Sequence, residues 1–224
     1  MTQEAIQLLT NPDKDTLVRL NALYEIVQEF EPTHFSLLEG ILQDTDEHPD
    51  VRSAVALALG KVGGQQAFNI LKGFEHEADI TVKNHVIQGL GMTGETDALP
   101  ILVNALWDSN NHVFASATNG LSLFGQRATS VLIELLDADK EDIRCVAAWR
   151  LGELEVREAV NPLLATLAEE KDPEVIALCV WALGEIGVYS DEVMTQLNAW
   201  RDNQNPDIYK RANDAIHKIA RHIN

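Results

Sequence analysis

Two tryptophans, an arginine and a cysteine are the side chains whose types and spacing could support binding or chemistry. Trp149 and Trp181 lie 32 residues apart at the same place in two copies of a repeated pattern, and Tyr24 holds that place in the first copy. Trp is enriched in binding hot spots, and two indoles on neighbouring helices could hold a flat ligand. Packing between helices is the alternative interpretation of the two indoles. Cys145 could be a nucleophile, but no histidine is expected beside it to activate the thiol.

Arg150 replaces a small residue at a packing position. The equivalent residues in five other copies are Ala58, Gly89, Gly120, Ala182 and Ala215. Because a buried charge must be paired, we expect Arg150 to form an ion pair with a carboxylate of a nearby turn. The candidate carboxylates are Asp137, Asp139 and Asp172. The alternative is a guanidinium that reaches outward past Glu153.

Catalytic and metal-binding motifs are absent from the sequence. The seven histidines are scattered, and no two of them have the i, i+4 spacing of a zinc-binding helix. His-Glu-x-x-His, Cys-x-x-Cys, a phosphate-binding glycine loop and a nucleophile elbow are all missing. We therefore predict no catalytic residue and no metal site.

These side chains belong to a pattern that recurs about every 32 residues, seven times. Each copy begins with a β-branched apolar residue, here called the anchor, which a basic residue usually follows. The anchors are Val18, Val51, Val82, Val113, Ile143, Val175 and Ile208, separated by 33, 31, 31, 30, 32 and 33 residues. A period of this size indicates a solenoid of helical pairs, in which no single unit buries its own apolar face.

Each copy is predicted to fold as helix A, a turn, and helix B around the anchor. The apolar residues of helix B fall at the anchor and three, four, seven and eight positions later, which form one stripe at about 100° per residue. Glycines are expected to close the B helices as left-handed caps. These glycines are Gly60, Gly63, Gly64, Gly91, Gly94, Gly125, Gly184 and Gly187. The predicted A helices are Gln3–Thr10, Thr33–Gln43, Gln65–Phe74, Thr96–Trp107, Arg127–Asp137, Glu158–Glu169 and Ser190–Arg201.

The predicted fold is therefore all-α, an α-α superhelix of about seven two-helix repeats. We expect one domain over 1–224 without a linker, because the pattern runs through the whole chain. The repeats are placed at approximately 1–30, 31–62, 63–94, 95–125, 126–156, 157–188 and 189–224.

The anchored phrases resemble the HEAT-repeat family, and within it the short bacterial form named for phycobilisome lyases. The matching segments are Pro49-Asp50-Val51-Arg52, Asp142-Ile143-Arg144 with 147–152, and Asp172-Pro173-Glu174-Val175 with 181–187. The resemblance covers essentially the whole chain and implies a HEAT-like solenoid whose B helices line the concave face. It also implies a buried Asp–Arg ladder between repeats. Phe114, Ile176 and Tyr209 replace the basic residue after the anchor, so we expect a broken ladder there.

The side of helix B opposite the apolar stripe is expected to line the groove. Its positions are two, five, six and nine residues after the anchor. They are mostly uncharged in this acidic chain, which suits a helix or a flat ligand. We predict a partner- or ligand-binding site formed by Tyr24, Leu57, Asn84, Gln88, Asn119, Trp149, Arg150 and Trp181.

The formal charge of −18, from 35 acidic and 17 basic residues, narrows the classes of partner. Phosphate backbones need clustered Lys and Arg, and anionic membranes attract basic surfaces, so we predict neither nucleic acid nor membrane as a partner. Residues 1–5 lack the basic and apolar regions of a signal peptide, and no apolar run could span a bilayer. Cys145 and Cys179 lie at different helix positions, which predicts free thiols and a cytoplasmic location.

Two functions of different classes fit these observations. The first is a non-catalytic scaffold or adaptor that binds a partner protein along its helix-B surface. The second follows from the resemblance, because relatives attach, isomerise or detach linear tetrapyrroles on phycobiliproteins, sometimes as heterodimers of two such chains, and are typically cyanobacterial. A bilin such as phycocyanobilin could then stack between Trp149 and Trp181, with Arg150 or Lys210 near its propionates.

The partner would be a phycobiliprotein or a second HEAT-like chain, and whether the chain is an enzyme stays open between these two functions. A HEAT-type DNA glycosylase is a third possibility, but it needs a basic concave face, which the charge of −18 does not provide.

Overall fold

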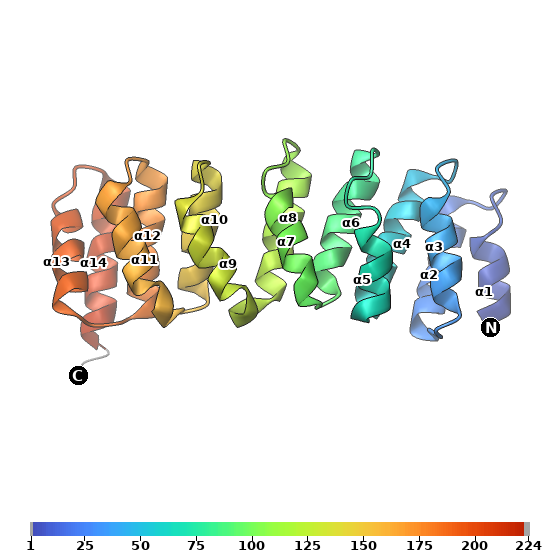
Figure 1. Cartoon of the computed structure of the whole chain (residues 1–224), viewed down its shortest axis with the longest axis horizontal. Helices are drawn as coiled ribbons and strands as arrows, with labels where there is room; N and C mark the ends of the chain where they lie inside the picture. Colours follow the sequence, from blue (N-terminus) through green and yellow to red (C-terminus); the bar gives the residue numbers. More distant parts are fainter. Residues whose placement is uncertain (1, 222–224) are drawn as a thin grey trace. The chain divides into compact units, whose positions relative to one another are not determined.

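The computed structural model describes residues 2–221, and it is built from α-helices in seven consecutive pairs (Figure 1). The predicted all-α fold of seven two-helix repeats is confirmed. The pairs are α1 (Thr2–Leu9) with α2 (Thr16–Gln28), α3 (His34–Gln43) with α4 (Pro49–Val62), α5 (Gly64–Lys72) with α6 (Ile80–Met92), α7 (Leu99–Ala105) with α8 (Asn111–Leu123), α9 (Thr129–Glu134) with α10 (Glu141–Glu153), α11 (Val160–Glu169) with α12 (Pro173–Ile186), and α13 (Asp191–Arg201) with α14 (Pro206–Arg221).

Short 3₁₀ turns flank the A helices of three pairs, at one end of α7 and of α11 and at both ends of α9. These turns are η1 (Thr96–Ala98), η2 (Gly125–Ala128), η3 (Leu135–Asp137) and η4 (Arg157–Ala159). The predicted helix over 127–137 is therefore three shorter pieces, η2, α9 and η3. Short 3₁₀ turns are frequent at helix termini, and residue periodicity does not separate them from α-helix.

The chain divides into two compact units, Met1–Phe124 (unit 1) and Gly125–Asn224 (unit 2). In unit 1 the B helices α2, α4, α6 and α8 pack side by side in chain order. In unit 2 the B helices α10, α12 and α14 do the same. The single uninterrupted domain expected from the repeats stays a prediction.

The B helices bury a wider side than one apolar stripe. The anchors of pairs two to seven are completely or almost completely buried, as predicted. The position five residues after the anchor is buried too, although it was predicted to face the groove. This correction applies to Leu23, Ala56, Ile87, Thr118, Ala148 and Val180. An inner B helix packs against its own A helix and against a B helix on each side, so both of its flanks are covered as well as the apolar stripe.

Some glycines predicted as caps lie inside the B helices and allow them to approach closely. A Cβ atom on Gly60 would lie 2.6 Å from the Cα of Gly89, and one on Gly91 would lie 2.5 Å from the Cα of Gly120. The cap prediction was therefore wrong for Gly60, Gly91 and Gly184. It was right for Gly187, a left-handed cap of α12, and positive-φ glycines also close α4 (Gly63) and follow the last residues of α6 and α8 (Gly94 and Gly125). Gly64 also has a positive φ, but it is the first residue of α5.

A ladder of ion pairs connects successive repeats, but its rungs pair Arg with Glu or Lys with Asp, in place of the Asp–Arg pairs that the resemblance implied. In each rung, the basic residue after one anchor pairs with an acidic residue in the turn before the next B helix. The rungs of unit 1 are Arg19–Glu47, Arg52–Glu77 and Lys83–Asp108, and unit 2 has Arg144–Glu170. The three arginines also donate to backbone carbonyls at the end of their own A helix or its turn.

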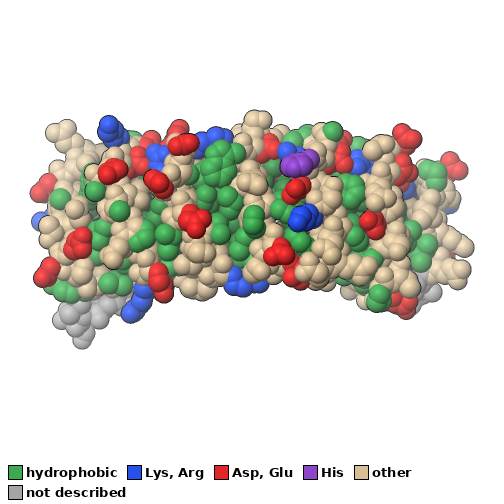
Figure 2. Space-filling model, in the orientation of Figure 1, with side chains coloured by type: hydrophobic (Ala, Val, Ile, Leu, Met, Phe, Trp, Pro, Cys, Tyr) green, Lys and Arg blue, Asp and Glu red, His purple; other side chains and the backbone are tan. Residues whose placement is uncertain are grey.

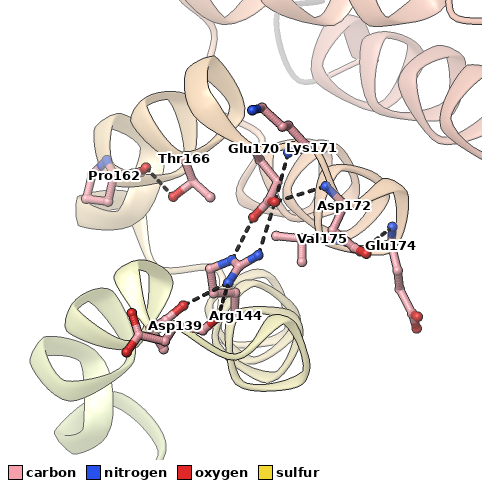
Figure 3. A network of polar contacts seen from close by, with 10 residues as sticks. Asp139, Arg144, Pro162, Thr166, Glu170, Lys171, Asp172, Glu174 and Val175 are labelled. Atoms are coloured by element: carbon pink, nitrogen blue, oxygen red, sulfur yellow. Dashed lines mark hydrogen bonds and ion pairs between the residues drawn. The ribbon is translucent and has the colours of Figure 1, made fainter.

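Figure 3 shows one rung in detail. Arg144 donates from Nε and Nη2 to the two carboxylate oxygens of Glu170, at 2.7 and 3.1 Å, and from Nη1 to the carbonyl of Asp139. Glu170 in turn accepts hydrogen bonds from the backbone N–H groups of Lys171 and Asp172. Burial raises the pKa of Glu170, but these hydrogen bonds and the Arg144 charge outweigh it, so its pKa lies below the usual value.

The acidic partner disappears wherever the basic one does. Phe114 and Ile176 stand directly after their anchors, where other repeats have a basic residue. In the repeat that follows each of them, the place of the rung acid, five residues before the next anchor, holds Ala138 and Asn203 respectively. The expected breaks in the ladder are therefore matched on both sides. A lone buried acid or base would be costly, which gives a physical reason for losing both together.

Candidate binding site

The exposed sides of α10, α12 and α14 in unit 2 enclose a pocket of about 410 Å³, here called the tryptophan pocket. Both Trp149 and Trp181 lie in its wall, as their shared repeat position predicted. The full lining is Cys145, Val146, Trp149, Glu174, Leu178, Trp181 and Arg211.

Trp149 presents its indole to this pocket while a guanidinium covers part of the ring. Its side chain is 40% exposed, and the guanidinium carbon of Arg150 lies 4.1 Å from the ring centroid. Arg150 is only 7% exposed and donates from Nη1 to Glu153 at 2.6 Å. The predicted ion pair with a turn carboxylate was therefore wrong. A carboxylate three residues away on the same helix lies within reach, and stacking on Trp149 satisfies the flat face of the cation.

Trp181 combines the two interpretations that the sequence left open. It lines the pocket and is partly exposed, yet its ring also packs against α10. A Cβ atom on Gly152 would lie 2.7 Å from Cζ3 of Trp181 and 2.8 Å from the Cα of Ala182. The missing side chain of Gly152 thus makes room for the indole between two helices.

The charged groups of the tryptophan pocket are Arg211 and Glu174. Arg211 donates from Nε to Asp207 at 2.8 Å, so its remaining N–H groups can face a ligand. Lys210, the expected partner of propionates, is exposed and does not line the pocket. Arg211 was not predicted, because the third position after the anchor was expected in the buried stripe, whereas it borders the pocket.

Cys145 lies in the pocket wall without the surroundings of a nucleophile. Burial, together with the nearby carboxylates of Glu174, Asp172 and Asp142, raises the pKa of the thiol to about 12. The thiolate, which is the reactive form, is therefore scarce at neutral pH. Cys145 and Cys179 are both free, as predicted.

A second pocket, of about 340 Å³, lies on the B helices α2, α4 and α6 of unit 1 and is here called the tyrosine pocket. It contains three of the predicted residues, Tyr24, Leu57 and Gln88. Its full lining is Leu20, Leu23, Tyr24, Val27, Ala54, Leu57, Ala58, Lys61, Gln88 and Met92. Lys61 holds its ammonium 5.7 Å from the Tyr24 ring centroid, so the rim carries one positive charge.

The other predicted residues lie in neither pocket. Asn84 accepts a hydrogen bond of 2.7 Å from Ser116, which ties α6 to α8. Asn119 is exposed on α8. Arg150 lies behind Trp149 and not in the pocket wall. A binding role for the eight residues stays a prediction. The structure places five of them in two separate pockets and three in neither.

The described residues were also searched for a basic surface, a metal site and a membrane-spanning helix. On the face shown in Figure 2, acidic side chains are spread among apolar and uncharged ones, and basic side chains occur singly or in small groups. Within residues 2–221 there is no group of three or more His, Cys, Asp or Glu side chains arranged to hold a metal ion. None of the helices over the same residues is long and apolar enough to cross a membrane.

Comparison with known proteins gives a family match, a relative and solved structures of the same fold. The family model described as HEAT repeats matches residues 2–79, 69–144 and 129–216. The bilin biosynthesis protein PecF of Nostoc sp. strain PCC 7120 is 26% identical over 143 residues, which cover 57% of this chain and 83% of PecF.

Two solved structures share the fold. One is from the complex of CpcE and CpcF of phycocyanin lyase from Nostoc sp. PCC7120, with 20% identity, a TM-score of 0.52, and coverage of 99% of this chain and 88% of that one. The other is the E. coli protein YibA, with 15% identity, a TM-score of 0.54, and coverage of 98% and 92%. The resemblance to HEAT proteins of the phycobilisome-lyase-like type is confirmed by these matches. Because the family model covers nearly the whole chain, and the helix pairs and ladder agree with it, this chain belongs to the HEAT-repeat family.

Proposed function

We propose that this chain handles a linear tetrapyrrole on a phycobiliprotein, with the tryptophan pocket as its bilin site. The observation that carries the proposal is the likeness to a bilin biosynthesis protein over most of that protein's length. Attachment, isomerisation and detachment of the bilin are all compatible with this role. Such a role belongs to an organism that makes phycobiliproteins, and the two free thiols favour a cytoplasmic location.

The chemistry of the tryptophan pocket suits this class of ligand. A linear tetrapyrrole is flat and conjugated, carries pyrrole N–H donors, and has two propionate groups. Trp149 offers an exposed indole face for stacking, and Arg211 offers N–H groups to a propionate. Glu174 could accept hydrogen bonds from pyrrole N–H groups. The raised pKa of Cys145 favours a bilin held without a covalent bond to this chain.

Absorption spectroscopy tests the proposal directly. Phycocyanobilin added to the purified protein should show a shifted and sharpened visible band, and Trp149→Ala should weaken its binding about tenfold, by about 1.4 kcal/mol. Trp107→Ala is a matched control, because Trp107 is 41% exposed and lines neither pocket. An unchanged spectrum of the added bilin, or equal losses in the two variants, would remove the tryptophan pocket as the bilin site.

A second candidate function is a non-catalytic adaptor, and the tyrosine pocket favours it. This pocket is lined mainly by apolar side chains of three neighbouring B helices, which suits the apolar face of a partner helix. A phycobiliprotein subunit is the partner to test first. Loss of its binding in Tyr24→Ala, with bilin binding retained, would assign protein recognition to unit 1.

A further inference from the structure

Arg150 occupies a place in the repeat where helix packing does not call for an arginine. Five other repeats carry Ala or Gly at this place, seven residues after the anchor. The small residue lets neighbouring B helices meet closely, and a Cβ atom on Gly152 would lie 2.8 Å from the Cα of Ala182. Arg150 is nevertheless only 7% exposed. The burial of its guanidinium therefore has a cause other than the packing that the small residues serve.

The hydrogen bonds of Arg150 do not balance its burial. Nη1 donates to Glu153, whose side chain is 49% exposed, so this partner lies at the edge of water. Nε is buried, and within residues 2–221 it has no hydrogen-bond partner. A buried donor without an acceptor costs stability, and a buried charge adds to that cost. The contact that offsets this cost is the one with Trp149.

The two indoles of the tryptophan pocket are held in different ways. The guanidinium carbon of Arg150 lies 4.1 Å from the centroid of the Trp149 ring. Trp149 lines the pocket and Arg150 does not, so the cation covers the side of the ring that is turned away from the pocket. The ring of Trp181 instead fills the space that Gly152 leaves free. Trp149 is thus supported by a cation, and Trp181 by packing against a helix.

We infer that Arg150 is a positioning residue of the tryptophan pocket, which fixes the ring of Trp149 by a cation–π contact and keeps its opposite face open to a flat conjugated ligand. An indole that is 40% exposed and lacks this support would exchange between rotamers, and a ligand would have to order it on binding. Arg150 acts through Trp149 and does not touch the ligand. That the ligand is a bilin rests on the proposed function, whereas the support of the ring does not.

Fluorine NMR of the full-length protein, labelled with fluorotryptophan and free of ligand, tests the support of the ring. The line of Trp149 is identified by its loss in Trp149→Phe. Arg150→Met should increase the mobility of the Trp149 ring, measured by fluorine relaxation, and leave the line of Trp181 unchanged. Arg150→Lys keeps the charge without the flat guanidinium and should increase the mobility less. Arg157→Met is the matched control, because Arg157 is exposed and does not line the pocket.

Urea unfolding of the same variants separates positioning from a structural role. Arg150→Met removes a buried donor that has no partner, so its midpoint should not fall below that of the wild type.

Binding of phycocyanobilin in a double-mutant cycle tests whether Arg150 acts through Trp149. Arg150→Met should weaken the binding about fivefold in the wild-type background. In the Trp149→Ala background the same change should have no further effect, because the ring that Arg150 supports is gone.

The outcomes decide the inference and separate it from the proposed function. An unchanged mobility of Trp149 in Arg150→Met overturns it, and so does a loss of stability that also alters the line of Trp181. An equal effect of Arg150→Met with and without the Trp149 indole overturns it in favour of a direct contact between Arg150 and the bilin. If the wild type binds no bilin, the proposed function fails, while the fluorine measurement still decides the role of Arg150.

Discussion

Units 1 and 2 use the same helix pairs but join their B helices with different chemistry. In unit 1, three ion-pair rungs and the facing glycines Gly60–Gly89 and Gly91–Gly120 hold the helices close together. In unit 2, one rung is present, and Trp181 packs over Gly152 between α10 and α12. The same repeat position then gives a tyrosine pocket in one unit and a tryptophan pocket in the other. The difference teaches that the repeat fixes where a pocket forms, while the residue six positions after each anchor sets which aromatic ring lines it.

The largest expected effect comes from removing a rung of unit 1. Arg52→Ala leaves the largely buried Glu77 without its cation, and the loss should reach about 4 kcal/mol of unfolding free energy. Urea unfolding followed by circular dichroism measures it. Arg157→Ala, at an exposed arginine of unit 2, is the control and should cost less than about 1 kcal/mol. Equal losses in the two variants would show that the rungs do not stabilise unit 1.

A smaller effect should follow from adding one methyl group between the B helices of unit 1. In Gly91→Ala the new Cβ meets the backbone of Gly120 at 2.5 Å, so α6 and α8 must move apart. We expect a loss of about 2 kcal/mol, measured by thermal unfolding. Gly40→Ala is the control, because nothing lies within 4 Å of a Cβ at that glycine. A stable Gly91→Ala variant would contradict the close approach.

Acid should weaken the rungs through their carboxylates. Burial raises the pKa of Glu77, but hydrogen bonds from the Asp79 backbone and from Arg52, with the Arg52 charge, bring its pKa below the usual value of a glutamate, 4.5. A carboxylate with a lowered pKa in the folded state stabilises the protein above its unfolded pKa, and this contribution is lost as the pH falls through the folded value. Wild-type stability should therefore decline below pH 4.5. Glu77→Gln should show a shallower decline than wild type, and Glu25→Gln, at an exposed site, should follow wild type.

The smallest expected effect comes from Glu155→Gly in the turn after α10. Four other repeats have a glycine at this place. Glu155 has φ 51°, and it lies twelve residues after its anchor, where Gly63, Gly94, Gly125 and Gly187 have positive φ in their repeats. A side chain is strained in this conformation, so Glu155→Gly should stabilise the protein by about 0.5–1 kcal/mol. Differential scanning calorimetry would detect the rise in melting temperature. A fall would mean that the Glu155 side chain makes a compensating interaction.

Helix periodicity was sufficient to predict the pairs and the position that faces each pocket. Trp149, Trp181 and Tyr24 are partly or largely exposed six residues after their anchors, as expected. The prediction that the position five residues after the anchor faces the groove was wrong. The sequence of one helix does not reveal that neighbouring helices cover both of its flanks. Ile87 and Val180 are buried for this reason.

Side-chain partners were harder to predict than helix faces. Arg150 can pair either with Glu153 on its own helix or with an acid of a turn, and it pairs with Glu153. The sequence does not show which of these carboxylates lies within reach of the guanidinium. Three of the rung acids lie at a constant place in the sequence, five residues before the anchors Val82, Val113 and Val175. They were not identified because each acid pairs with a base of the preceding repeat. The joint loss of base and acid at Phe114/Ala138 and Ile176/Asn203 is the signal that could have identified them.

The matched rungs also determine which shortened versions of the protein should hold together. Excising the third pair would set Arg52 against Asp108, so the new junction in unit 1 would still join a base to an acid. Excising the sixth pair would set Arg144 against Asn203, which leaves a guanidinium facing an amide. Removing an inner helix pair of unit 1 thus preserves a base facing an acid at the new junction, whereas removing the middle pair of unit 2 does not.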